Sequence, residues 1–486
     1  MISFLISMAL LVVGYFTYGR FIERVFSPDS HKKTPAFEYQ DGVDYIPLPT
    51  WKIFMIQFLN IAGLGPIFGA IMGAKYGAAC YLWIVFGCIF GGATHDYLSG
   101  MLSVRHGGMS LPEIVGQYLG LPTKQVMRGF SVLLLVLVGA VFVKGPADLL
   151  AKLTPENLDV TFWIFLVFIY YIIATLLPVD KIIGRIYPVF AIALIFMAVG
   201  ILVMLLWYHP TLPEVWDGLQ NTHPKKDVLP IFPMMFISIA CGAISGFHAT
   251  QSPLMARCLK NEKYGRPIFY GSMIVEGMVA LIWAAAATYF FHYGDLFGQK
   301  GFQEDSAAVI VQFMTSHWLG TFGSALAILG VVAAPITSGD TAFRSARLIV
   351  ADFLNLEQKS MSKRLLISIP LFVAAIVLLL WSQKDPGGFG KVWRYFSWSN
   401  QTLAVFTLWT VTVYLLKSNK QWILTLIPAL FMTAVCSTYL FISPDVFGLS
   451  HELSYTIGGA LTLLSLVLFI MYYRNTMIKD RLKNSL

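Results

Sequence analysis

Long apolar runs dominate this chain of 486 residues, and they constrain its fold more than any other feature. A helix that crosses a lipid bilayer needs about 20 largely apolar residues. Thirteen such runs follow one another along the sequence, at residues 2–19, 52–74, 76–104, 126–147, 160–178, 185–208, 229–256, 266–292, 319–346, 364–382, 398–417, 421–442 and 455–474. The sequence therefore predicts an all-α polytopic membrane protein with about 13 transmembrane helices, surrounded by the lipid bilayer.

Composition excludes the main alternatives. Hydrophobic residues make up 57% of the chain and charged residues only 12%, about half of the ~25% that is usual in soluble domains. Disorder requires low hydropathy, and a membrane β-barrel would show alternating segments of about ten residues. The five cysteines have neither the spacing of a metal site nor that of a disulfide framework, so we interpret them as small packing residues.

The basic residues indicate the topology. If the N-terminus lies outside the cell, the inward-facing loops hold 25 of the 34 Lys and Arg residues, and the outward-facing loops hold the other 9. Cytoplasmic loops of membrane proteins carry this kind of excess. We expect the N-terminus outside, the C-terminus in the cytoplasm, and a location in the cell (inner or cytoplasmic) membrane. The net charge of +8 then reflects topology, and no nucleic-acid partner is expected.

Helix-breaking residues interrupt the second run near its middle. Within residues 60–66, Asn60 is followed by Gly63, Gly65 and Pro66. Glycine and proline both disfavour continuous helix. Unwound backbone at membrane depth is costly unless it lines a cavity or a ligand. A simple proline kink or small-residue packing between helices would also explain one such segment taken alone.

The seventh run is interrupted at a corresponding place. Residues 241–253 contain two glycines, Ser245, His248 and a Ser-Pro pair. The two breaks lie five helices apart, so they occupy matched positions in two five-helix halves, which have opposite orientations because five is odd. Paired interruptions of this kind are the best sequence pointer to a transporter binding site. We therefore predict a 5+5 inverted-repeat core, with one helix before it and two after it.

This interpretation divides the chain into four parts. Residues 1–51 hold the first helix and a cytoplasmic linker, residues 52–228 the first repeat, residues 229–417 the second repeat, and residues 418–486 two accessory helices and a cytoplasmic tail. The ends of broken helices offer free N–H groups to a substrate carboxylate and free carbonyl groups to a cation. The candidate substrate-binding residues are Asn60, Gly63, Gly65, Ser245 and His248.

Ionisable residues inside the apolar runs need a partner or a function, because charge at membrane depth is costly. Glu276 lies in the eighth run with no basic residue near it in sequence, which suits a proton carrier. The alternative is a neutral glutamic acid that is hydrogen-bonded between helices. His95 and Asp96 lie late in the third run and could relay a proton. Neighbouring residues point in different directions on a helix, so these two need not pair, and they could simply be polar residues near the inner rim.

The ninth run ends in a polar stretch that has candidate coupling residues. Asp340 and Arg344 are four residues apart, so they face the same way and can pair. Arg344 could instead serve only as an anchor that reaches the membrane interface. Thr337 and Ser338 add hydroxyl oxygens, which a small hard cation such as Na⁺ could use.

One further pair of charges lies in the fourth run. Lys144 and Asp148 are one helical turn apart, so we expect an ion pair between them. Their position is near the outer rim of the membrane, where they could contribute to an outer gate.

Several stretches of the sequence make a family resemblance visible. They are residues 60–70, 83–92, 103–108 and, most specifically, 335–347, whose polar and glycine positions have no general explanation in membrane helices. Over about residues 50–475 the sequence resembles the carbon starvation protein A family of bacterial and archaeal membrane proteins. The resemblance implies membership of the amino acid–polyamine–organocation superfamily and a leucine-transporter-type inverted-repeat fold, which agrees with the 5+5 interpretation of the breaks.

The resemblance also implies a function. The family is associated with nutrient uptake during carbon starvation, a stress response, with pyruvate or short peptides as proposed substrates and proton coupling proposed. We therefore expect a secondary active transporter that couples uptake of such a small molecule to protons. A Na⁺-coupled symporter of a small organic acid or amino acid, and a channel, are the alternatives.

Other classes of activity are not expected. An enzyme would need a catalytic constellation, and the sequence has neither H-E-x-x-H nor G-x-S-x-G. ATP-driven transport would need a phosphate-binding G-x-x-x-x-G-K-[ST], which is also absent from the sequence. We expect no cofactor and no metal, and a coupling ion that is H⁺ rather than Na⁺.

Overall fold

The computed structural model describes residues 1–176, 179–293, 307–356, 360–384 and 388–484. Within these ranges every regular element is helical. The first half of the chain forms α1 (Ile2–Phe16), α2 (Tyr18–Phe26), α3 (Pro35–Glu38), α4 (Thr50–Ile61), η1 (Gly65–Gly69), α5 (Ala70–Ala74), α6 (Ala79–Leu82), η2 (Trp83–Gly92), α7 (Ala93–Arg105), α8 (Leu111–Leu119), α9 (Leu121–Leu153), α10 (Val160–Leu176) and α11 (Val179–Tyr208).

The second half continues with short helices around the second predicted break and then with long ones. They are η3 (Val215–Asp217), η4 (Ile231–Met235), α12 (Phe236–Ser238), α13 (Gly246–Ala256), η5 (Glu262–Tyr264), η6 (Arg266–Tyr270), α14 (Gly271–Tyr293), α15 (Ala307–Leu354), α16 (Met361–Lys384), α17 (Gly388–Lys417), α18 (Ile423–Ile442) and α19 (His451–Asn484). The long helix α15 is interrupted at Gly320, whose φ of 63° and ψ of −171° are not helical.

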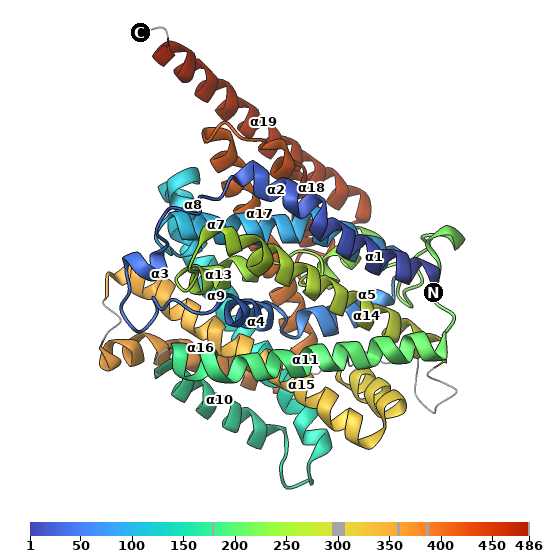
Figure 1. Ribbon diagram of the computed structural model, residues 1–486. Helices are drawn as coiled ribbons and strands as arrows, with labels where there is room; N and C mark the ends of the chain where they lie inside the picture. The colour runs from blue at the N-terminus through green and yellow to red at the C-terminus, as the bar shows by residue number, and fades with distance from the viewer. Residues whose placement is uncertain (177–178, 294–306, 357–359, 385–387, 485–486) are drawn as a thin grey trace.

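The buried apolar side chains of these helices form one large contiguous core. Figure 1 shows α18 and α19 together at one edge of the molecule, with the C-terminal part of α19 extending beyond its body. Many large apolar residues on the outer faces are exposed, for example Leu464 of α19 and Val377 of α16. An apolar outer surface of this kind belongs in a bilayer.

Helix overlaps each of the thirteen predicted apolar runs. Among the described residues, seven helices are long and apolar enough to cross a membrane, or eight if one bent pair counts as a single span. The protein is therefore a multi-pass, all-helical membrane protein, and the count of thirteen spans stays a prediction. Among the others, the run at residues 229–256 forms η4, α12 and α13 in place of one long helix, because glycine and proline divide it.

The first break is real and is shorter than the sequence suggested. α4 ends at Ile61, only residues 62–64 are non-helical, and the next helical segment begins at Gly65. The two segments on either side are bent by 53° relative to each other. Pro66 lies in the first turn of η1, where its missing N–H is tolerated. Asn60 is therefore in the last turn of α4 and not in the unwound backbone.

The second break begins earlier than predicted. The non-helical residues are 239–245, between α12 and α13, and α13 then runs without interruption past His248 and Pro253 to Ala256. The prediction that residues 241–253 are unwound is therefore wrong for residues 246–253. Proline removes only one hydrogen bond from a helix, and the side chains of this helix are fully buried, so packing holds it together. His248 consequently lies on helix, just past its N-terminus.

The two breaks pack directly against each other. A Cβ atom placed on Gly65 would lie 2.2 Å from Sγ and 2.3 Å from Cβ of Cys241. A Cβ atom on Gly69 would lie 2.8 Å from the carbonyl oxygen of Ser238, and one on Gly73 would lie 2.1 Å from Cγ1 of Ile239. The glycines after the first break thus give the room that the second broken segment occupies.

Candidate functional site

Four ionisable side chains from three helices meet beside the second break. Nδ1 of His95 lies 2.7 Å from Oδ1 of Asp96, and both residues belong to α7. The other carboxylate oxygen of Asp96 lies 2.8 Å from Nδ1 of His248 on α13. Nε2 of His248 lies 3.4 Å from Oε2 of Glu276 on α14. All four side chains are fully buried.

The geometry forms a continuous chain in the order His95, Asp96, His248, Glu276. Asp96 bridges two imidazole rings with its two oxygens, and it orients His248 so that the opposite ring nitrogen faces Glu276. Imidazole can accept a proton on one nitrogen and release one from the other, so this arrangement can pass a proton between carboxylates. The buried positions of His95 and Asp96 do not fit the alternative that they are merely polar residues near the rim.

Sequence reasoning named these four residues but could not join them. It held that the adjacent His95 and Asp96 need not pair, whereas they are hydrogen-bonded. It also could not place His248 beside either carboxylate, because that contact is between residues 152 positions apart. Glu276 has no hydrogen bond from another described residue, so the alternative of a glutamic acid hydrogen-bonded between helices has no described partner to support it.

Asn400 on α17 fixes the end of the second break. Its Oδ1 accepts hydrogen bonds from the hydroxyl of Ser245 at 3.0 Å and from the backbone N–H of Phe247 at 2.7 Å. Its Nδ2 donates to Sγ of Cys241 at 3.3 Å. One side chain thus holds the unwound segment and the first turn of α13 together. The sequence analysis missed Asn400, although an asparagine in an apolar run was a signal that could have drawn attention to it.

The first break has unused hydrogen-bonding groups. Asn60 and Gln57 lie one turn apart on α4, both are fully buried, and neither side-chain amide has a partner among the described residues. A Cβ atom on Gly63 would lie 3.3 Å from Oγ of Ser338, whose hydroxyl donates to the carbonyl oxygen of Leu59 at 2.8 Å. The predicted residues Asn60, Gly63 and Ser338 therefore gather at this break, and Gln57 is an addition to them.

Thr337 and Ser338, whose hydroxyl oxygens were suggested for a cation, have different hydrogen-bond partners. The Thr337 hydroxyl donates to the carbonyl oxygens of Ala333 and Ala334 in its own helix, α15. Ser338, in contrast, reaches across to α4, as described above. Both hydroxyl oxygens keep lone pairs, so either can still accept from or coordinate a ligand.

Asp340 and Arg344 each contact residues of other segments. Oδ2 of Asp340 accepts a hydrogen bond of 2.6 Å from the hydroxyl of Tyr187 on α11. The guanidinium of Arg344 donates to the carbonyl oxygen of Ala174 at 2.8 Å and lies 4.0 Å from Oδ1 of Asp44. Arg344 is fully buried, so it is not an interfacial anchor that reaches water. Tyr187 was not found from the sequence.

The predicted pair of Lys144 and Asp148 is present on α9. Nζ of Lys144 contacts Oδ1 of Asp148, and both side chains are partly exposed. The pairing follows from their i, i+4 spacing. It lies apart from the four-residue chain, so a part in an outer gate stays a prediction.

The same region has the only donor set among the described residues that could suit a metal ion. Sγ of Cys241, a ring nitrogen of His248 and a carboxylate oxygen of Glu276 all lie within 4.8 Å of one another. The thiol already accepts a hydrogen bond from Asn400, and His248 is held by Asp96. Glu276 has no hydrogen-bond partner among the described residues and lies only in ion-pair contact with His248. The expectation of no metal stays a prediction.

Comparison with known sequences gives the family. The pattern of the family described as "Carbon starvation protein CstA" matches residues 1–157, 147–299 and 297–439. The chain is 27% identical to the peptide transporter CstA of Bacillus subtilis, over 95% of this chain and 94% of that protein. It is 45% identical to an uncharacterized membrane protein of Haemophilus influenzae, over 60% of this chain and 91% of that protein.

A further relative is named for another substrate. The pyruvate/proton symporter BtsT of Escherichia coli is 28% identical, over 58% of this chain and 48% of that protein. These named relatives are transporters, which agrees with the expectation that the chain is not an enzyme.

Solved structures with a similar fold are also transporters. The manganese transporter of Eremococcus coleocola has a TM-score of 0.59 at 12% identity and covers 90% of this chain and 99% of its own. MhsT in complex with L-phenylalanine has a TM-score of 0.55 at 12% identity and covers 85% of this chain and 97% of its own. At such low identity the likeness shows the fold alone, and it agrees with the leucine-transporter-type expectation. The sequence match, which extends over residues 1–439, places this chain in the carbon starvation protein CstA family.

Proposed function

We propose that this protein is a proton-coupled symporter that takes up pyruvate or a short peptide across the cytoplasmic membrane. The named relatives support the substrate class, since one is called a peptide transporter and another a pyruvate/proton symporter. The observation that carries the proposal is the buried chain from His95 to Glu276, which adjoins the two touching breaks. A transporter needs a ligand site joined to a proton-carrying group, and in this proposal the two breaks supply the first and the buried chain supplies the second.

The proposed architecture is a 5+5 inverted repeat, made of residues 52–228 and 229–417. Its support is the contact between Gly65 and Cys241, because inverted repeats bring their broken helices together near the midplane. In this arrangement the N-terminus is outside, α18 and α19 are accessory helices, and the C-terminal tail is in the cytoplasm, as the excess of basic residues in alternate loops suggests.

The substrate carboxylate is proposed to bind between the breaks. The start of α13 at Gly246 offers an anion the positive end of the helix dipole and the first-turn N–H groups other than that of Phe247, which donates to Asn400. On the other side, the buried amides of Asn60 and Gln57 have unused donors and acceptors. A carboxylate with a carbonyl or amide group next to it, as in pyruvate or a peptide, would use both kinds of group.

Coupling is proposed to act through the position of His248. This residue is the third of α13, so it lies within one turn of the N–H groups that would meet the substrate. Its ring touches Glu276 on one side and Asp96 on the other. Addition of a proton to Glu276 changes the charge that faces His248, and this change reaches the start of α13 through a rigid, fully buried ring.

Uptake into proteoliposomes tests the proposal. An inward proton gradient should drive accumulation of pyruvate or a dipeptide in the absence of Na⁺. Glu276→Gln should abolish accumulation but leave exchange of labelled for unlabelled substrate, because exchange needs no net proton movement. Thr288→Ala is the matched control, since Thr288 is buried on the same helix and its hydroxyl donates to the carbonyl oxygen of Ala284, outside the chain from His95 to Glu276. Unchanged accumulation in Glu276→Gln would remove Glu276 from the mechanism.

The Na⁺-coupled alternative rests on Ser338, whose hydroxyl lies beside the first break. Accumulation that requires a Na⁺ gradient, ignores the proton gradient and is lost in Ser338→Ala would favour this alternative. Entry that follows only the substrate's own gradient would favour a channel.

A further inference from the structure

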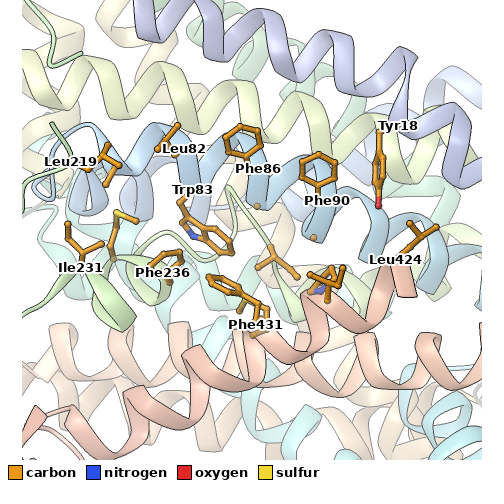
Figure 2. A pocket seen from close by; sticks show the side chains of 18 residues that line it. Tyr18, Leu82, Trp83, Phe86, Phe90, Leu219, Ile231, Phe236, Leu424 and Phe431 are labelled. Carbon is orange, nitrogen blue, oxygen red and sulfur yellow. The ribbon is translucent and has the colours of Figure 1, made fainter. Parts of the chain in front are cut away.

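An apolar groove lies between η2, α12 and α18. It has a volume of about 610 Å³, within the roughly 300–1,000 Å³ of small-molecule sites. Figure 2 shows its two long walls, with Trp83, Phe86 and Phe90 of η2 on one side and Phe431 of α18 on the other.

The chemistry of the walls excludes a polar ligand. Of the lining side chains, only those of Tyr18 and Trp83 have an O–H or N–H group. The Trp83 Nε1–H already donates to the carbonyl oxygen of Ile239 at 3.2 Å. A carboxylate or a peptide would lose its hydration here without new hydrogen bonds, which is unfavourable. The groove is therefore not a second site for the transported substrate, and it fits a hydrocarbon chain.

The groove also opens towards lipid. Ile427 on one wall is 64% exposed and Phe86 on the other is 47% exposed, although both lie in apolar runs that are predicted to cross the membrane. What surrounds such side chains in the bilayer is acyl chain and not water. The occupant with access to the groove is thus a membrane lipid.

Positive charge lies at one end. Tyr18 and Leu424 line this end of the groove, as Figure 2 shows. Arg20 follows Tyr18 by two residues and is exposed, and Lys420 lies four residues before Leu424, in the turn that precedes α18. Nζ of Lys420 contacts the carbonyl oxygen of Phe26 at the end of α2, so the two basic segments are held together. Basic residues at a membrane surface attract anionic lipid headgroups.

The groove reaches the back of the second break. Ile244, in the unwound segment, and Phe236 of α12 both form part of its wall. A Cβ atom on Gly91 of η2 would be in ordinary contact with Ile244, at 3.4 Å. A chain bound in the groove would therefore contact the half-helix and the unwound backbone that the transport site also uses.

We propose that this groove binds one acyl chain of an anionic phospholipid, with the headgroup at the end formed by Tyr18, Arg20 and Lys420. The bound chain packs against α12 and the unwound segment through Phe236 and Ile244. This site goes beyond the proposed transport function and does not depend on which substrate is carried.

Photolabelling tests the site directly. The full-length protein is placed in phosphatidylcholine nanodiscs with a trace of phosphatidylglycerol that has a diazirine on its acyl chain, and the adducts are mapped by mass spectrometry. Adducts should concentrate on residues 82–91 and 424–432. The exposed apolar face of α19 is the comparison surface. Equal labelling of α19 and the groove would overturn the proposal.

Filling the groove gives the second readout. Ile427→Trp and Leu82→Trp enter from opposite walls, and each should reduce groove adducts by about tenfold, which corresponds to about 1.4 kcal/mol. Leu464→Trp on α19 is the matched control, because Leu464 is also exposed and apolar. If neither groove variant lowers the labelling, the lipid does not bind in the groove.

Substitution of the two basic residues tests the preference for an anionic headgroup. Arg20→Gln combined with Lys420→Gln should remove the excess of phosphatidylglycerol adducts over those of a phosphatidylcholine probe, while Lys363→Gln on the same side should not. Equal labelling by the two lipids in the unchanged protein would contradict the anionic assignment. Labelling needs no transport, so a failure here is distinct from a failure of proton-coupled uptake.

Discussion

The backbone N–H of Phe247 donates a 2.7 Å hydrogen bond to the side-chain oxygen of Asn400, which lies 153 residues later in the chain. The same oxygen accepts from Ser245, so one buried side chain sets the conformation in which the unwound segment enters α13. Because α13 begins there, the position of the proposed anion site depends on this contact.

Asn400→Ala should therefore weaken substrate binding more than it weakens the fold. The variant leaves two buried donors without a partner, at about 1–3 kcal/mol for each group. We expect a Kd at least about tenfold higher, the equivalent of about 1.4 kcal/mol, measured by the substrate-induced shift in melting temperature. Thr407→Ala is the control, since the Thr407 hydroxyl only donates to Leu403 on the same helix. Equal substrate shifts in the two variants would show that Asn400 does not set the site.

Asp96→Asn should uncouple transport. The asparagine side chain has one oxygen that accepts hydrogen bonds and one NH₂ group that only donates. It therefore cannot accept from both imidazole rings, and the chain between His95 and His248 is broken. Proton-driven uptake should fall by about 10²-fold, as is usual when a proton-transfer group is lost, while substrate exchange continues.

Two other variants on α7 complete this test. Ser99→Ala should behave as the unchanged protein, because the Ser99 hydroxyl only donates to the carbonyl oxygen of Asp96. His95→Gln, at the end of the chain, should shift the pH profile of uptake. If exchange and driven uptake decline together in Asp96→Asn, the residue is structural and does not couple.

The contact between the two breaks predicts a rescue. Gly65→Ala places a methyl group 2.2 Å from Sγ and 2.3 Å from Cβ of Cys241, which should destabilise the protein by about 1–3 kcal/mol. Cys241→Gly should restore most of this loss, whereas Cys241→Ala should not, because it keeps the Cβ atom.

Thermal unfolding in detergent measures both effects. Gly129→Ala is the matched control, since nothing lies within 4 Å of the added methyl group and the position is in a helix. It should be neutral or stabilising, because alanine is the better helix former. A Gly65→Ala protein as stable as the control would mean that the two segments are not in contact.

Asp352 predicts a pH dependence of stability. It lies beyond the ninth apolar run, at the end of α15, and burial raises the pKa of its carboxyl group above the usual range. The folded state therefore holds this proton more tightly than the unfolded state. The favourable contribution is full at low pH and is lost as the pH rises through the folded pKa.

Asp352→Asn should thus raise the melting temperature at about pH 7, and the gain should shrink at about pH 5. The asparagine keeps an oxygen that can accept the 3.0 Å hydrogen bond from Ser110. Asp217→Asn, at an exposed residue at the end of η3, is the control. An Asp352→Asn protein that is less stable at pH 7 would contradict the cost of charge burial at this position.

Features that are local in the sequence could be predicted. Apolar runs signal helices through their length alone, and helix overlaps each of them. Gly63, Gly65 and Pro66 act on their own backbone, so the first break was placed within two residues. The pairing of Lys144 with Asp148 also follows from spacing on one helix.

Features that depend on packing could not be predicted. The second break was placed too late because Pro253 looks like a helix breaker, yet burial keeps α13 intact around it. Nothing in the sequence near Asn400 shows that its partner is Phe247, and nothing near Asp96 indicates His248. These contacts join distant segments, so only the folded chain brings them together.

The close approach of Gly65 to Cys241 means that the residue at one position limits the size of the residue at the other. A relative with a side chain at the position of Gly65 needs a smaller residue at the position of Cys241. Otherwise the two backbone segments that meet there must lie further apart. Sequence variation at this pair should therefore be correlated across the family, and a relative with larger residues at both positions should hold its two breaks further apart.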